Sequence, residues 1–184
     1  MLSDNELMQQ IVSGDQLAFS ELYVRYKDRM YYYFYRMLGN SGEQANDFLQ
    51  ELFLKLIEKP ERYNASYSFK TWLFSVANNM CKNEYRSRSI RLEYQEYEAT
   101  QPKVDFLKEK SIETEKVLEK VFETLHDLGD EHRSAFILRY REGFSIKEVS
   151  EILDLPEGTV KSRLFYAKKL LAGKLDYLKN EIEF

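Results

Sequence analysis

The sequence predicts an all-α protein with two helical domains joined by a linker. Apolar residues recur every three or four positions through most of the 184-residue chain, which is the spacing of one face of an amphipathic helix. Glycine and proline, which often interrupt helices, number only 7 and 3, and we find no convincing strand. The helical spacing weakens from Glu93 to about Lys110 and then resumes. We therefore expect domains at residues 1–92 and 112–178, with a linker at residues 93–111.

The first two helices of the N-terminal domain are expected on either side of a Ser-Gly-Asp turn. The first covers about Asp4 to Val12. The second begins near Asp15, and its expected inner face carries residues at helical spacing: Ala18, Leu22 and Tyr26. It continues through the aromatic run from Tyr31 to Tyr35 and ends between Gly39 and Gly42. We interpret the aromatic run as packing and interface, without a chemical role.

Two further helices complete this domain. The third covers about Glu43 to Lys59 and ends at Pro60, and its apolar stripe consists of Phe48, Leu52, Phe53 and Leu56. A polar loop at residues 62–68 precedes the fourth helix, which covers about Phe69 to Arg88. That helix has basic residues at its far end and a stripe made of Trp72, Val76 and Met80. We expect Trp72 to be largely buried, because large apolar residues at helical spacing are more often core than nucleic-acid contacts.

The small numbers of cysteine and histidine residues argue against several function classes. The chain has a formal net charge of −4, one cysteine, Cys81, and two histidines, His126 and His132. So few metal-binding side chains argue against a zinc site and against histidine-dependent catalysis, and we expect no cofactor, no metal and no small-molecule substrate. No apolar run approaches the roughly 18 residues that span a bilayer, and the N-terminus has no export signal. We therefore expect a cytoplasmic protein that is not membrane-embedded.

The C-terminal domain contains a predicted helix-turn-helix from Gly143 to Leu171. Ser145 and Glu148 form a capping-box signature at the start of its first helix. A tight turn is expected at Asp154-Leu155, and Pro156 suits the first position of the second helix. Upstream, helical spacing predicts helices that carry Val117, Val121, Leu125, Leu128 and, over about residues 131–141, Ala135, Ile137 and Leu138.

The second helix of this motif has the features of a DNA recognition helix. Its apolar residues are spaced four, three and four: Val160, Leu164, Ala167 and Leu171. The opposite face offers Thr159, Lys161, Ser162, Arg163 and Phe165, with Lys169 further along. Residues 157–174 contain five basic residues and one acidic residue, so the local charge is +4. Such a face can enter the major groove, where lysine and arginine pair with guanine edges, although a helical hairpin with a solvated basic face is the alternative.

The residues from Ala135 to Leu153 and from Glu157 to Leu164 closely resemble the C-terminal domain of sigma factors of the extracytoplasmic-function type. In that family, this domain binds the −35 promoter element and the polymerase flap. The positions that match its DNA-contacting motif are Lys161, Ser162, Arg163 and Phe165. Two positions depart from the family pattern. Asp154 replaces a common glycine in the turn but tolerates a left-handed backbone, and Tyr166 stands where many members have a basic residue.

Two segments of the N-terminal domain resemble the same family. Residues 46–56 resemble the segment that docks on the clamp helices of the polymerase largest subunit, and their expected exposed face consists of Asp47, Gln50, Glu51 and Leu54. An ordinary surface helix is the alternative for this segment. Residues 63–79 resemble the family's promoter-melting and −10-reading region, with a base-specificity loop at residues 64–68. The resemblance implies −10 DNA contacts by Tyr63, Asn64, Ser66, Tyr67, Lys70, Asn79, Lys82 and Arg86.

The resemblance implies a promoter-specificity subunit rather than an enzyme. Such a protein binds core RNA polymerase, recognises the −35 and −10 elements of promoter DNA through separate domains, helps to melt the DNA, and has an anti-sigma factor as a further partner. Two other hypotheses remain open. One is a DNA-binding regulator with an N-terminal sensor or dimerisation lobe, and the other is a helical adaptor or decoy that binds polymerase or an anti-sigma factor without using DNA. An enzyme is least supported, because the sequence shows no metal cluster, glycine-rich phosphate loop or nucleophile–base pair.

Overall fold

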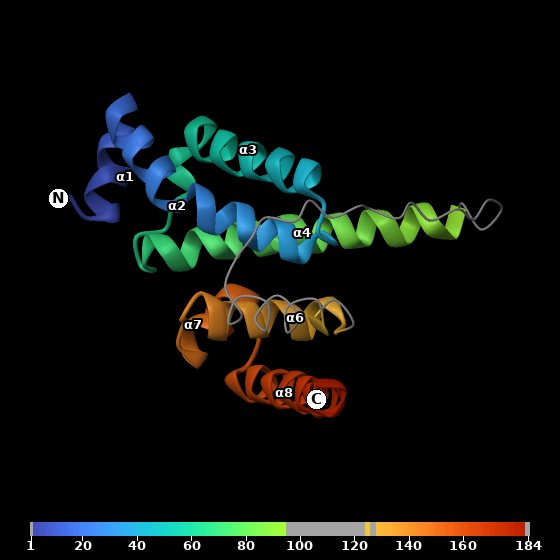
Figure 1. The fold of residues 1–184 in the computed structure, drawn as a ribbon. Coiled ribbons are helices and arrows are strands. Elements are labelled where there is room, and N and C mark those ends of the chain that lie inside the picture. Colours follow the sequence, from blue (N-terminus) through green and yellow to red (C-terminus); the bar gives the residue numbers. More distant parts are fainter. Residues whose placement is uncertain (1, 95–123, 126–127, 183–184) are drawn as a thin grey trace. The chain divides into compact units, whose positions relative to one another are not determined.

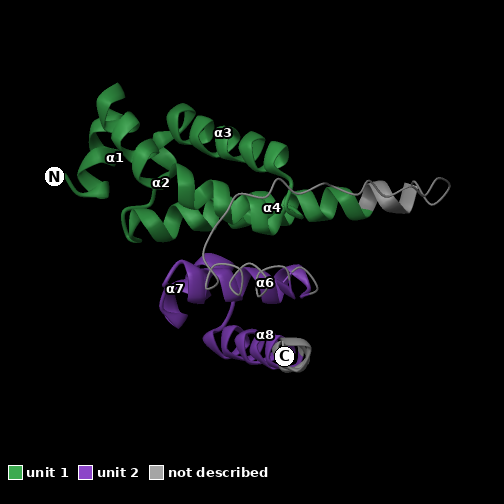
Figure 2. Ribbon diagram, viewed as in Figure 1, with its two compact units in different colours: residues 1–99 green, residues 100–184 purple. Residues whose placement is uncertain are grey.

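The computed structural model describes residues 2–94, 124–125 and 128–182 of the chain (Figure 1). Every regular element in these residues is helical, which confirms the predicted all-α class. The chain separates into two compact units, residues 1–99 and residues 100–184 (Figure 2). Two helical units therefore replace a single core, as the sequence predicts.

The predicted linker lies almost entirely outside the described residues. Its first two positions, Glu93 and Tyr94, belong to the last turn of the helix that precedes it. That helix continues past Arg88, where the sequence analysis ended it, because no glycine or proline interrupts residues 88–94. Of the upstream apolar positions in the second unit, Leu125 and Leu128 are buried, whereas Val117 and Val121 lie outside the described residues.

In residues 2–94, unit 1 contains the four helices expected from the sequence and one short 3-10 turn. They are α1 (Asp4–Val12), α2 (Gln16–Met37), α3 (Gly42–Glu58), η1 (Pro60–Arg62) and α4 (Phe69–Tyr94). In Figure 1, α2 lies between α3 and α4, and α1 packs against α2. Helix α2 therefore contacts each of the other three helices of this unit.

Polar side chains set the first residues of these helices. The Ser3 hydroxyl and the Glu6 carboxylate form a capping box at the start of α1. Asp15 accepts hydrogen bonds from the first backbone N–H groups of α2, and Ser41 does the same for α3. At the start of α4, the Ser68 hydroxyl accepts a hydrogen bond from the Thr71 amide at 3.1 Å. These caps satisfy donors that have no partner within the helix, so each start is fixed locally.

The core of unit 1 is rich in aromatic rings because α2 buries two of its five consecutive aromatic residues. Tyr33 and Phe34 are fully buried, while the other three residues of that run are half-buried. Tyr33 meets Phe74 of α4 edge-on with ring centroids 5.4 Å apart, and Phe34 meets Phe48 of α3 at 5.5 Å. Phe48 is half-buried, so the innermost stripe of α3 comprises Ala45, Leu49, Leu52, Phe53 and Leu56. These edge-to-face contacts hold both neighbouring helices on α2.

Unit 2 contains the expected helix-turn-helix and the helix that precedes it. Helix α6 (Asp130–Phe136) continues into a π-helical turn, η3 (Ile137–Arg141), and is followed by α7 (Ile146–Leu153) and α8 (Glu157–Ile182). The π-helical turn was not predicted. It is closed by a hydrogen bond from the Glu142 amide to the Ile137 carbonyl at 3.0 Å, and Arg139 donates to the Phe144 carbonyl at 2.7 Å. The side chain of Arg139 thus ties the end of the first helix to the start of the helix-turn-helix.

Removing buried volume from α2 should unfold unit 1 much more readily than the same change on its surface. Leu22 is fully buried, whereas Leu17 on the same helix is 81% exposed. We expect Leu22→Ala to lower the free energy of unfolding by about 2–5 kcal/mol, because it leaves a cavity. Leu17→Ala should change it by no more than about 0.5 kcal/mol. Urea denaturation followed by circular dichroism measures both values, and equal losses would contradict the described packing.

Candidate nucleic-acid interface

The helix-turn-helix of unit 2 has the local geometry that the sequence predicts. The Ser145 hydroxyl accepts from the Glu148 amide at 3.2 Å, and the Glu148 carboxylate accepts from the Ser145 amide at 2.8 Å, which confirms the capping box. Asp154 has a left-handed backbone (φ 55°, ψ 57°), as the turn requires. Pro156 precedes the first helical residue, Glu157, instead of occupying that position. Its carbonyl accepts the first hydrogen bonds of α8, so it acts as the N-cap.

Helix α8 buries one stripe and presents the opposite face to solvent. Among residues 157–173, for which burial is described, the buried ones are the four predicted residues Val160, Leu164, Ala167 and Leu171. On the other face, Lys161, Ser162 and Lys169 are exposed, Thr159 is half-buried, and Phe165 is 64% exposed. The Ser162 hydroxyl donates to the Gly158 carbonyl at 3.0 Å and retains lone pairs for an outside donor. The arrangement offers cationic, hydroxyl and aromatic groups side by side near the start of one helix.

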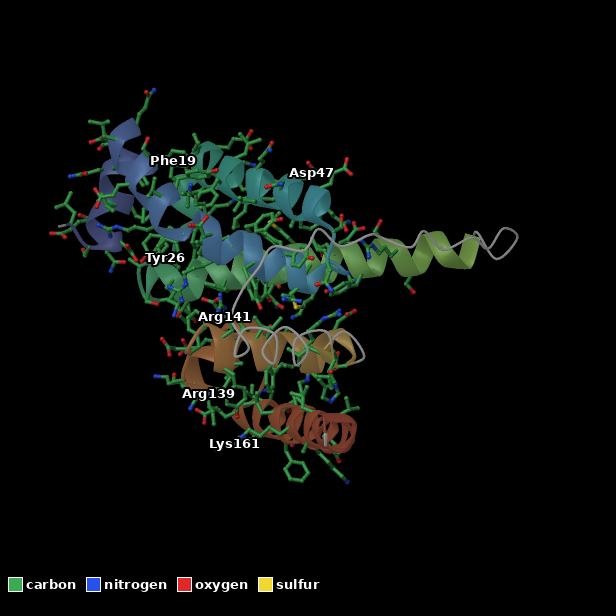
Figure 3. The ribbon with its side chains drawn as sticks, viewed as in Figure 1. Phe19, Tyr26, Asp47, Arg139, Arg141 and Lys161 are labelled. Atoms are coloured by element: carbon green, nitrogen blue, oxygen red, sulfur yellow. The ribbon has the colours of Figure 1, made fainter. Side chains whose placement is uncertain are left out.

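Two basic residues on this face differ in how they are held. Lys161 (labelled in Figure 3) is 3.9 Å from Glu157 on the same helix, and its side chain is 62% exposed. Arg163 lies 2.6 Å from Glu131 of α6, and its side chain is only 16% exposed. Both residues are predicted DNA contacts, but the acidic partner of Arg163 was not predicted, because Glu131 is distant from it in sequence.

Two further residues of α8 that the sequence did not predict as DNA contacts, Tyr166 and Lys168, lie near the same face. Tyr166 is exposed, and its ring meets His132 of α6 edge-on at 6.2 Å. The Lys168 ammonium lies 5.1 Å from the centroid of the exposed Tyr140 ring. Lys168 follows Lys161 by seven residues, which is two helical turns, so this spacing was the available signal. The basic surface of α8 therefore includes Lys168 in addition to the predicted basic residues.

In unit 1, helix α3 carries a second candidate surface. The four predicted residues Asp47, Gln50, Glu51 and Leu54 are all exposed on α3, on the side away from its buried stripe (Asp47 is labelled in Figure 3). Ile57, one turn beyond Leu54, is 50% exposed and extends this surface. Ile57 was not predicted, although its spacing of three from Leu54 places it on the same face of the helix. Acidic groups beside two exposed apolar side chains suit a contact with another helix.

Tyr63 anchors the loop that follows η1. Its hydroxyl lies within hydrogen-bond distance of the Asn5 Oδ1 atom of α1 and of the Tyr67 carbonyl at 3.1 Å. Its ring meets Phe69 at 5.7 Å and Trp72 at 5.4 Å, both edge-on. Burial raises the pKa of Tyr63, in keeping with its half-buried position. The side chain thus holds both ends of the loop.

The loop and α4 present the remaining predicted residues. The Asn64 side chain accepts from the Ser66 amide at 2.9 Å, which folds residues 64–66 into a turn. Of the predicted set, these two residues, Tyr67, Asn79, Lys82 and Arg86 are exposed, whereas Lys70 is half-buried. On α4, the spacing of three and four places Asn79, Lys82 and Arg86 on one side of the helix.

Trp72 differs from the expectation. It is half-buried rather than largely buried, because it packs on Tyr63 and Phe69 at the edge of the core. Phe69 takes the inner position and is fully buried against Tyr26. Asn78, next to the exposed Asn79, is buried, and its Oδ1 atom accepts from the Tyr33 hydroxyl at 3.3 Å.

Residues 2–94, 124–125 and 128–182 contain no group of three histidine, cysteine, aspartate or glutamate side chains placed to hold a metal ion. None of the helices in these ranges has the length and apolar character needed to cross a membrane. Cys81 is buried and carries no disulfide. The candidate surfaces of the described chain are therefore the outward faces of α3, α4, α8 and the loop after η1.

The anchoring role of Tyr63 predicts a coupled pair of substitutions. Tyr63→Phe keeps the ring and removes the hydroxyl, so it should lower the free energy of unfolding by about 0.5–1.5 kcal/mol. Asn5→Ala should have a similar effect, and the double variant should lose less than the sum, because both changes remove one contact. Tyr67→Phe, at an exposed side chain, is the matched control and should have little effect. Strictly additive losses in urea denaturation would contradict the contact.

Comparison with known families and relatives gives the chain a context. The family model described as Sigma-70 region 2 matches residues 22–90, and the model described as Sigma-70, region 4 matches residues 118–171. The ECF RNA polymerase sigma-E factor of Haemophilus influenzae is 30% identical over 96% of this chain and 97% of its own length. The sigma-E factor of Escherichia coli strain K12 is 32% identical over 96% of each chain. The sigma factor SigW of Bacillus subtilis is 30% identical over 91% of this chain and 94% of its own.

Solved structures agree with these sequence matches. The structure of CnrH in complex with the cytosolic domain of CnrY has a TM-score of 0.70 and 25% identity, covering 95% of this chain and 97% of that chain. The sigma factor RpoE from Bartonella quintana, in complex with the anti-sigma factor NepR, has a TM-score of 0.71. It is 21% identical and covers 86% of this chain and 96% of its own, which supports the fold. The chain belongs to the sigma-70 family and, within it, to the extracytoplasmic-function RNA polymerase sigma factors.

Proposed function

We propose that this chain directs core RNA polymerase to specific promoters and initiates transcription by recognising −35 and −10 elements and melting DNA. Membership of the sigma family supports this function along the whole chain. The observation that carries it is the pairing of two different exposed faces, each opposite a fully buried stripe. The face of α3 is acidic and apolar, and the face of α8 is basic, polar and aromatic. The first suits a protein partner and the second suits DNA.

The exposed face of α8 is assigned to the −35 element. Its start carries Lys161, Ser162 and Phe165, with Thr159 and Lys169 at the two ends of the set, and a helix of this kind enters the major groove by its N-terminal half. Lysine pairs with guanine edges, and an exposed phenylalanine contacts the thymine methyl group. Lys169, like the added Lys168, suits phosphate contact. Arg163 belongs to the same surface through its pair with Glu131.

The loop after η1 and the adjoining face of α4 are assigned to the −10 element. Tyr67 is exposed and available for stacking on an unpaired base, which contributes about 1–3 kcal/mol. Asn79 offers an amide for a flipped base edge, while Lys82 and Arg86 suit the phosphates beside it. Asn64 and Ser66 lie in the same loop, and Lys70 lies in the first turn of α4 beside it. Tyr63 serves this site by holding the loop in place.

The face of α3 is assigned to core polymerase. Leu54 and Ile57 supply apolar area at the centre, and Asp47, Gln50 and Glu51 supply polar specificity around it. This is the composition of a helix-on-helix contact in which a few apolar anchors carry most of the affinity. The same type of protein surface suits an anti-sigma factor, and the solved relatives CnrH and RpoE are each held in a complex with a second protein. An anti-sigma partner is therefore part of the proposal.

Three finer points of the proposal follow from these assignments. The chain acts by binding and not by catalysis, and it works in the cytoplasm, where core polymerase and promoter DNA are found. Residues 1–92 form the polymerase and −10 domain, residues 93–111 the linker, and residues 112–178 the −35 domain. Each domain makes some of the contacts to the promoter, and promoter binding requires both domains.

Run-off transcription tests the proposed function. We expect the chain with core polymerase to transcribe from promoters selected out of a DNA library with randomised −35 and −10 elements. Lys161→Ala with Phe165→Ala should abolish most of that selection while leaving polymerase binding intact, because these side chains face DNA. Folded chain that neither binds core polymerase nor supports transcription would refute the proposal. Transcription that ignores both substitutions would favour an adaptor that does not use DNA through α8.

Polymerase binding should depend on the outward face of α3. Leu54→Ala with Ile57→Ala should weaken binding to core polymerase about 5- to 30-fold, equivalent to about 1–2 kcal/mol, because it removes both apolar anchors. Val24→Ala on α2, where the side chain is also exposed, is the matched control and should leave binding unchanged. Binding measured by fluorescence anisotropy of labelled chain gives both values. Equal weakening by the control would show that the polymerase surface lies elsewhere.

A further inference from the structure

The start of helix α6 is linked to the DNA-facing part of helix α8 by an ion pair between Glu131 and Arg163. We propose that Arg163 is a positioning residue held by Glu131, and that it does not itself contact a base of the −35 element. The proposal rests on the assignment of α8 to the −35 element. It narrows base recognition to three exposed residues near Arg163: Lys161, Ser162 and Phe165.

The first support is how Arg163 is held. Its Nη2 atom lies 2.6 Å from the Glu131 Oε2 atom, which is the distance of a charge-assisted hydrogen bond. Its side chain is 16% exposed, compared with 62% for Lys161, which lies 3.9 Å from its own acidic neighbour. Lys161 is therefore free to extend toward a ligand. Arg163 must give up both a short ionic contact and much of its packing to do the same.

A second contact joins the same two segments. His132, next to Glu131, meets the ring of Tyr166 edge-on with centroids 6.2 Å apart. Two consecutive residues of α6 thus contact Arg163 and Tyr166, which lie three positions apart on α8 and hence on adjacent turns of one face. Together with the buried stripe beneath them, these contacts fix the rotation of α8 about its own axis. Arg163 is placed to hold the helix.

The electrostatic consequence supports the same assignment. The Glu131 side chain is 70% exposed, so without Arg163 it would present an uncompensated carboxylate beside a surface that binds phosphates. The carboxylate and the DNA phosphates are both negative and repel each other, so the chain would bind DNA of every sequence less tightly. While the ion pair is intact, Arg163 neutralises Glu131, and the net charge seen by DNA comes from the lysines. Recruiting Arg163 to a base would remove that neutralisation at the moment of binding.

Charge reversal distinguishes a positioning arginine from a base-reading one. The full chain is bound to core polymerase, and the probe is the ratio of binding to a selected −35 element over a scrambled one. R163E should lower this ratio about tenfold, because the repulsion between residues 131 and 163 shifts α8 and displaces Lys161 and Phe165 from their positions on the bases. Adding E131R should restore the ratio to within about threefold of the unchanged chain, because the reversed pair holds α8 equally well.

Lys161 and Glu157 provide the matched control, since they form an exposed acid–base pair on the same helix. K161E should lower the ratio about tenfold, and adding E157K should not restore it, because Lys161 itself reads DNA.

Failure of E131R to rescue R163E, or no effect of R163E, would overturn the positioning role. If the unchanged chain binds the selected and the scrambled −35 element equally well, the result refutes the proposed promoter function and not the positioning role. Thermal unfolding and polymerase affinity of every variant confirm that each one is folded.

Discussion

Burial of a single apolar stripe on each helix is the constraint on which the rest of this structure depends. In α8, the stripe Val160, Leu164, Ala167 and Leu171 is removed from water, and this fixes which side of the helix faces outward. At about 25 cal/mol per Å² of apolar area, rotating such a helix by one residue would expose several side chains at a cost of several kcal/mol. The positions of Lys161 and Phe165 are therefore consequences of core packing. The same reasoning places Asp47 and Leu54 on the outer side of α3.

Features that depend on local sequence could be predicted, and features that depend on distant residues could not. The stripe of α8, the capping box at Ser145 and the left-handed Asp154 follow from spacing and from single-residue preferences, and all three are present. The Arg163–Glu131 pair joins positions 32 residues apart, and the Tyr63–Asn5 contact joins positions 58 apart. The spacing of apolar residues along the sequence does not predict such pairs. Trp72 was misjudged for the same reason, because its exposure depends on where Tyr63 brings the loop.

The segregation of charge reconciles an acidic chain with a DNA-binding function. The formal net charge is −4, although residues 157–174 carry +4 and α4 has Lys82 and Arg86 exposed at its surface. A protein with few phosphate contacts binds DNA weakly alone, because each neutralised phosphate contributes to affinity through counterion release. Attachment to polymerase changes this, since a second binding event within one complex benefits from a high effective concentration. Modest basic patches on separate domains then suffice for promoter binding and limit attachment to other DNA.

Site-specific photo-crosslinking tests whether core packing leaves the exposed face of α3 to contact polymerase and the exposed face of α8 to contact DNA. A photoreactive residue is placed singly at position 54 or at position 165, both exposed, and the chain is assembled with core polymerase on a promoter fragment. We expect crosslinks to a polymerase subunit from position 54 and to DNA around the −35 element from position 165. Crosslinks from position 165 to polymerase alone, or from position 54 to DNA, would contradict this expectation.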